Sequence, residues 1–155
     1  MKGSLLNYST SIDAGKTAME IVGLLAAHRC LHINLETDGL GVFTGITFGI
    51  MVGQKEQGFR LPVNAEAVLD ALRANNRQGK VQPRFVNKEQ ASKVAWRIVK
   101  DWVEAQIAII ESGMATTAEV FLPYLITDTN QTLYERLSER SFALLSAPAG
   151  AQSVV

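Results

Sequence analysis

The chain has 155 residues and a mass of 16.9 kDa, which is the size of a single domain. A hydrophobic fraction of 47% with 19% charged residues is typical of a globular protein and excludes an intrinsically disordered one. The 15 basic side chains balance the 15 acidic ones, so the overall charge predicts no polyanionic partner. The single cysteine, Cys30, excludes an internal disulfide framework and a cysteine-rich zinc site. Because no apolar run reaches the ~18 residues of a membrane helix, and no signal peptide opens the chain, we expect a cytoplasmic protein without membrane contact.

The first half predicts one helix followed by three strands. Asp13 is a candidate cap for a helix over residues 14–28, whose apolar side chains recur at helical spacing. Three segments then alternate apolar and polar residues as strands do: 31–36, 42–52 and 59–63. Short turns join them, which favours an antiparallel meander. Three glycines there, Gly41, Gly45 and Gly49, indicate close approach of another layer or a strongly twisted ribbon.

The second half predicts helices. Asn64 is a candidate cap for a helix to about residue 75, and Asn87 with Gln90 resembles a capping box that starts a long helix over 88–112. Two further capping boxes follow, Thr116–Glu119 and Thr132–Glu135. The expected fold is therefore α+β: an N-terminal helix, a three-stranded antiparallel meander, and a helical half dominated by one long central helix. We expect a single domain over residues 1–146 and a flexible tail over 147–155.

The long helix carries two apolar stripes. The first is Ala91, Val94, Ala95, Ile98, Trp102, Ala105 and Ile109; the second is Val99, Val103, Ile107 and Ile110, with Trp96 beside it. Two stripes require contacts on more than one side of the helix. A chain of this size has few layers to surround such a helix, so we expect a homo-oligomer. The alternative is a helix that is central within the monomer.

The net charge of the chain is zero, but its charges are unevenly distributed along the sequence. Residues 73–100 hold eight basic side chains against one acidic one, Glu89, a net charge of +7, and the rest of the chain carries −7. These lysines and arginines, with two aromatic residues that could stack on a nucleobase, predict a site for a phosphate-bearing ligand. The candidate residues are Arg73, Arg77, Lys80, Arg84, Phe85, Lys88, Lys93, Trp96, Arg97 and Lys100. The alternative is a solvated face or a subunit contact, neutralised by Glu104, Glu111 or the acidic first half.

Catalytic and metal motifs are weak. Gly15–Lys16–Thr17 ends like a P-loop, but Thr10 stands where that motif needs its first glycine. His28, Cys30 and His32 alternate, yet no fourth zinc ligand lies nearby. Nothing in the sequence resembles a catalytic triad or a pair of catalytic carboxylates. We therefore expect a protein that is not an enzyme and holds no metal or cofactor.

Four runs of the chain stand out together: 5–10 (LLNYST), 59–62 (FRLP), 94–106 (VAWRIVKDWVEAQ) and 120–124 (VFLPY). They resemble a family of small uncharacterised proteins of tailed phages and prophages, over about Leu5 to Leu137. The resemblance implies a phage accessory protein in the host cytoplasm and supplies no site residues. Small non-catalytic phage proteins often bind nucleic acid, host macromolecules or signalling nucleotides, and some are oligomeric sponges for the nucleotide messengers of bacterial immunity.

Three functions follow as expectations. The first is a homo-oligomer that sequesters a phosphate-bearing ligand, such as a nucleotide immune messenger, through the basic 73–100 segment. The second is a DNA- or RNA-binding accessory of phage replication or recombination. The third is an inhibitor that binds a host protein through the second apolar stripe of the long helix.

Overall fold

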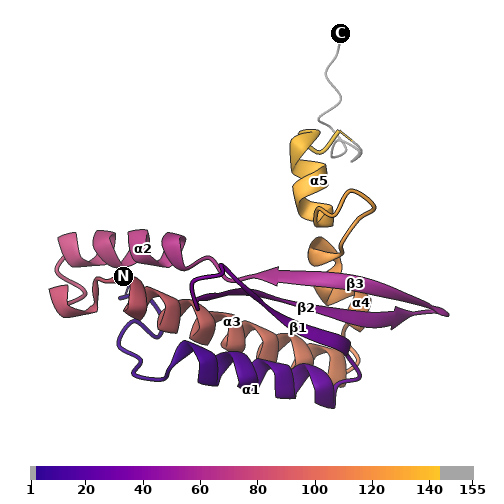
Figure 1. Ribbon diagram of the computed structural model, residues 1–155, viewed down its shortest axis with the longest axis horizontal. Helices are drawn as coiled ribbons and strands as arrows, with labels where there is room; N and C mark the ends of the chain where they lie inside the picture. Colours follow the sequence, from indigo (N-terminus) through magenta and orange to yellow (C-terminus); the bar gives the residue numbers. More distant parts are fainter. Residues whose placement is uncertain (1–2, 144–155) are drawn as a thin grey trace, which may run out of the picture.

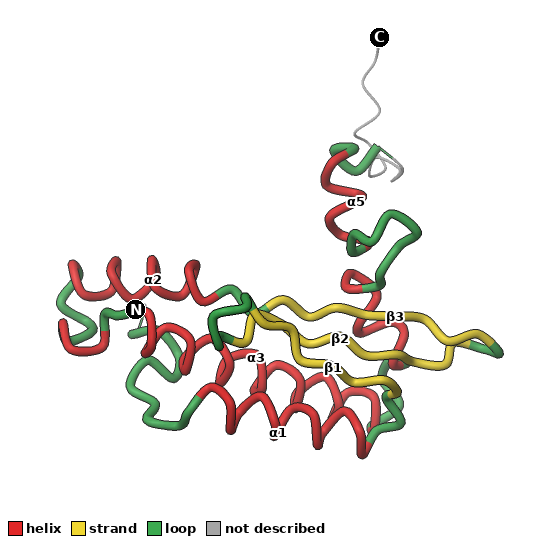
Figure 2. Tube along the Cα trace, viewed as in Figure 1, coloured by secondary structure: helices red, strands yellow, loops and turns green. Residues whose placement is uncertain are grey.

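The structure, a computed structural model, describes residues 3–143 and confirms the predicted α+β fold. Figures 1 and 2 show the elements in space. In chain order they are α1 (Ala14–Ala27), β1 (Leu31–Thr37), β2 (Phe43–Val52), β3 (Lys55–Pro62), α2 (Ala65–Arg77), the 3₁₀ turn η1 (Pro83–Phe85), α3 (Lys88–Glu111), α4 (Thr117–Phe121), η2 (Leu122–Tyr124) and α5 (Leu133–Glu139). The predicted tail, residues 147–155, lies outside the described residues.

The three strands form one antiparallel sheet in the order β1-β2-β3. β3 begins at Lys55, four residues before the predicted strand, because Val52 already pairs with Lys55 across a two-residue turn. The tip of this hairpin is exposed on both faces, so its residues form strands without alternating apolar and polar side chains. Apolar periodicity alone therefore missed the start of β3.

One helical layer covers one face of the sheet. Figure 1 shows α1 and α3 side by side along the sheet, with α2 against the first half of α3. The main core lies between these layers and includes Ile21, Ile46, Phe59, Trp96 and Phe121, each at most 2% exposed. A smaller core joins α2, α3 and the loop between them: Leu69, Leu72, Val81 and Ala91. This smaller core holds α2 and the loop after it against the start of α3.

Two glycines of β2 make room for polar contacts across the other face of the sheet. The Arg60 Nε of β3 lies 3.2 Å from the Glu36 carboxylate of β1, on either side of Gly45. A Cβ at Gly45 would come within 3.2 Å of that carboxylate and 3.0 Å of a backbone oxygen. A Cβ at Gly49 would meet the Glu56 carboxylate, which instead contacts His32 at 2.6 Å. The glycines thus permit contacts between the two outer strands.

The long helix α3 is central within one chain. Its second stripe packs into the main core under the sheet, where Val103 is fully buried and Ile107 is 6% exposed. The other stripe begins at Ala91, which packs against α2 in the smaller core, and continues at Ala95 in the main core. Two stripes therefore do not by themselves require a second copy, and the homo-oligomer stays a prediction. The host-inhibitor hypothesis loses the surface on which it depended.

Most of the predicted caps are present. The side chains of Asn64 and Asn87 accept the expected backbone N–H bonds, and both threonine capping boxes are complete. Two expectations were wrong. Asp13 makes no side-chain cap at the start of α1. The Gln90 amide does not return to Asn87 but donates to the carbonyl oxygens of Tyr8 and Thr10.

The C-terminal segment from α4 to α5 leaves the main body beside β3 (Figure 1). The backbone N–H of Ile126 donates to the Gly58 carbonyl at 2.8 Å, which adds a short bridge to the edge of the sheet. Arg60 donates to the backbone and side-chain oxygens of Asn130 at 3.0 and 3.1 Å. The same guanidinium therefore joins β1, β3 and the loop before α5.

His28 links the ends of α1 and α3. Its Nδ1 lies 2.7 Å from the Leu24 carbonyl oxygen and its Nε2 lies 2.8 Å from the Glu111 carboxylate. Both nitrogens face acceptors, so both contacts are hydrogen bonds only in the protonated ring. The bond to Glu111, and then that to Leu24, raises the pKa of His28 above its ordinary value.

We expect a pH dependence of stability from this contact. Because the pKa of His28 is higher in the folded chain, its contribution is complete below pH ~6.5 and disappears as the pH rises through the folded value. Urea unfolding at about pH 5.5 and pH 8.5 should give a smaller free energy at the higher pH. The Glu111→Gln variant should lose most of that difference. An equal pH dependence in this variant would contradict the assignment to His28.

Candidate functional site

The structure places nine of the ten predicted site residues in three groups, with Lys93 in two of them, and buries the tenth, Trp96, in the core. Three bases of α3 face α1 and pair with carboxylates. Arg97 lies 2.9 Å from Glu20, and Lys100 lies 2.6 Å from Glu104. Lys93 lies 3.5 Å from Glu89 and 3.8 Å from Asp13. Along the α1–α3 seam, the basic side chains are thus neutralised by Glu104 and by carboxylates of the first half of the chain, as the alternative interpretation expected.

Trp96 is not available to a ligand. Its side chain is fully buried in the main core, and its indole N–H donates to the Phe43 carbonyl at 3.3 Å. The Phe43 ring meets it edge-on, with centroids 6.4 Å apart. The expectation that Trp96 offers a stacking face was wrong, because this residue faces the sheet and not the basic loop.

The second group forms an exposed basic end around the loop between α2 and α3. Its members Arg73, Arg77 and Arg84 are exposed, and Lys80 is half-buried. Arg73 pairs with Asp70 at 3.2 Å, whereas the others make no ion pair within residues 3–143. The Arg84 guanidinium lies 4.7 Å from the centre of the Phe85 ring, which also meets the ring of Tyr8 edge-on and packs against the smaller core. These bases line none of the four main hollows of the described chain.

The third group opens onto a pocket of about 520 Å³ where the starts of α1, α2 and α3 meet the turn before β2. This volume lies within the usual range for small-molecule sites. Its apolar lining includes Ala14, Val42, Phe43, Ala65 and Leu69. Its charged lining is Lys88, Lys93, Asp13, Asp38, Glu66 and Glu89. Two of the predicted bases, Lys88 and Lys93, thus reach the same cavity.

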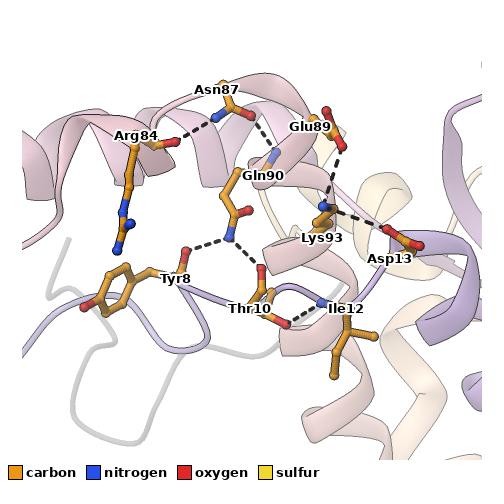
Figure 3. Close-up of polar contacts among 9 residues, drawn as sticks. All are labelled: Tyr8, Thr10, Ile12, Asp13, Arg84, Asn87, Glu89, Gln90 and Lys93. Carbon is orange, nitrogen blue, oxygen red and sulfur yellow. Dashed lines mark hydrogen bonds and ion pairs between the residues drawn. The ribbon is translucent and has the colours of Figure 1, made fainter.

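The start of α1 is open toward this pocket. Asp13 does not cap the helix, and its carboxylate instead lies near Lys93 (Figure 3). The first backbone N–H groups of α1 therefore lack a side-chain acceptor, unlike those of α2 and α3. Gly15 also lines the pocket, and a Cβ there would meet the Phe43 ring at 3.5 Å. Free N–H groups at a helix start favour an anion.

Gln90 joins the segment before α1 to the start of α3. It is 9% exposed, and its amide nitrogen donates to the carbonyl oxygens of Tyr8 and Thr10 at 2.8 and 2.9 Å (Figure 3). These bonds fix the segment before α1 against the start of α3. The sequence indicated Gln90 only as part of a cap, since its long-range partners are backbone atoms that no pattern marks.

The candidate zinc residues do not converge. His28 contacts Glu111 and His32 contacts Glu56. Within residues 3–143, no three histidine, cysteine, aspartate or glutamate side chains are placed to hold a metal ion. Burial raises the pKa of the Cys30 thiol to about 11.

We expect Cys30 to be inert in the folded protein. A thiol with this pKa is protonated near pH 8, and its side chain is 9% exposed. Iodoacetamide, followed by intact-protein mass spectrometry, should modify the urea-unfolded chain quickly and the folded chain hardly at all. Similar rates in the two states would show that Cys30 is accessible.

No protein-family model matches the chain, and neither a curated protein nor a solved structure matches it. The phage and prophage origin therefore stays a prediction. No helix of residues 3–143 is long and apolar enough to cross a membrane.

Proposed function

We propose that the protein is a non-catalytic binding protein that takes a nucleotide into the pocket at the starts of α1, α2 and α3. The observation that carries this proposal is the convergence of Lys88 and Lys93 with the uncapped start of α1 on one ligand-sized cavity. A phosphate group placed there receives positive charge from Lys88 and hydrogen-bond donors from the Lys93 ammonium group and the start of α1. The apolar part of the lining, with Phe43, suits the base and sugar.

Lys93 is suited to this role. Its side chain is 20% exposed, and its two carboxylate neighbours lie at 3.5 and 3.8 Å, beyond close hydrogen bonds. A ligand phosphate can therefore accept a shorter bond from its ammonium group than either carboxylate does. In a phage or prophage context, such a protein would sequester a nucleotide messenger of bacterial immunity.

Isothermal titration calorimetry with AMP, GMP, CMP and UMP tests this proposal. At least one nucleotide should bind, and Lys88→Gln should weaken it at least about tenfold, since a hydrogen bond to a charged group contributes about 1.5–3 kcal/mol. Lys55→Gln, at the exposed tip between β2 and β3, is the matched control and should bind normally. Unchanged binding in Lys88→Gln would remove the pocket from the proposal.

A second candidate function is nucleic-acid binding on the exposed basic end. Arg77, Lys80 and Arg84 favour it, because none of them makes an ion pair within the described chain and none lines the main hollows; Arg77 and Arg84 are exposed, and Lys80 is half-buried. Fluorescence anisotropy with a labelled oligonucleotide tests it. Neutralising these three residues with glutamine should weaken binding and lower the salt slope by about 0.9 for each lost phosphate contact with duplex DNA.

The two functions separate in a crossed experiment. Lys88→Gln should lower nucleotide affinity and leave the oligonucleotide nearly unaffected, whereas the triple variant of the basic end should do the reverse. If the triple variant loses oligonucleotide binding and Lys88→Gln changes neither affinity, nucleic-acid binding is the better supported function.

A further inference from the structure

The charges around the pocket bear on the kind of nucleotide it accepts. We infer that the pocket selects a ligand with a single phosphate group, a monoester or a diester, and rejects nucleoside diphosphates and triphosphates. This inference rests on the proposed function, since it concerns the same cavity.

The pocket has more carboxylates than ammonium groups. Four carboxylates line it, against two lysines. Asp13 and Glu89 lie beside Lys93 and offset its charge. Lys88 is exposed and pairs with no carboxylate within residues 3–143. The positive charge available to a ligand is therefore that of one lysine and one helix start, which matches a single phosphate.

Two carboxylates would oppose any further phosphate. One oxygen of Asp38 accepts the N–H groups of Leu40 and Val42 at 2.7 and 3.2 Å, and no base of the described chain pairs with that carboxylate. Glu66 is exposed in the first turn of α2 and likewise pairs with no base of residues 3–143. Because Asp38 and Glu66 both line the cavity, a longer phosphate chain meets negative charge without new cations.

Competition between AMP, ADP and ATP tests the inference, in buffer with EDTA so that no metal ion bridges phosphates and carboxylates. We expect affinity to fall by about tenfold for each added phosphate, a loss in the range of a charge repulsion across a partly solvated pocket. In the double variant Asp38→Asn with Glu66→Gln, the gap between AMP and ATP should shrink by about tenfold. Asparagine keeps an acceptor oxygen for the turn at residue 38.

The matched control is Asp70→Asn with Glu139→Gln, which removes the same charge outside the pocket. This variant should keep the full preference for AMP. ATP binding as tightly as AMP to the original protein would overturn the inference and leave the proposed function standing. Binding of none of the nucleotides would overturn the proposed function and the inference with it. A gap that shrinks equally in the control would show that overall charge, and not the pocket, sets the preference.

Discussion

The Trp96→Ala variant should lose about 3–5 kcal/mol of unfolding free energy, as expected for truncation of a large buried aromatic side chain. The Trp96 side chain is fully buried, and its removal also leaves the Phe43 carbonyl without its indole donor. For a domain of this size, such a loss lowers the melting temperature by about 10 °C. Urea unfolding followed by circular dichroism measures the change.

Trp102 supplies the matched control on the same helix. It is partly exposed and meets Phe121 and Tyr124 edge-on, with ring centroids 5.8 and 5.6 Å apart. Its truncation to alanine should cost less than half as much as that of Trp96. Equal losses, or a larger loss at Trp102, would contradict the placement of Trp96 at the centre of the core.

The Val42→Trp variant should abolish nucleotide binding without changing any charge. Val42 lines the pocket just before β2 and is 42% exposed, so a larger side chain can be accommodated without unfolding the sheet. An indole ring there fills the mouth of the cavity. We expect at least about a hundredfold loss of affinity by calorimetry, the size of effect that follows when a ligand is sterically excluded.

Val52 is the control for this steric test. It is the last residue of β2, at the far tip of the hairpin, and is 41% exposed. Val52→Trp therefore adds the same side chain at the same exposure away from the pocket, and it should bind normally. Full binding by Val42→Trp would place the nucleotide elsewhere.

Local patterns were enough to predict most of the fold. The strands predicted at residues 31–36 and 42–52 and the caps at Asn64 and Asn87 depend on neighbours in the chain, and the structure confirms them. The start of β3 was missed, because the exposed hairpin tip has no buried face to impose alternation. Asp13 was wrong as a cap: its carboxylate accepts no N–H group of α1 and lies 3.8 Å from Lys93, a long-range neighbour that no local pattern marks.

The site depended more on tertiary contacts than the fold did. The basic segment was visible as a charge count, yet the count could not show that Arg97 and Lys100 face Glu20 across the α1–α3 seam. The pocket brings together residues as distant as Ala14 and Lys88, and no motif joins them in the sequence. Of the predicted site residues, only Lys88 and Lys93 line the pocket. The rest of the lining comes together through the packing of three helix starts, which the sequence does not show.

An amide NMR titration with AMP would locate the bound nucleotide on the protein. If the nucleotide enters the pocket, the backbone signals of Gly15, Gly41 and Ser92, which line it, should shift with one saturable affinity. The signals of Gly53 and Gly113, at the hairpin tip and after α3, should stay in place. Shifts confined to Gly79 and its neighbours in the basic end, or no shifts at all, would contradict the account.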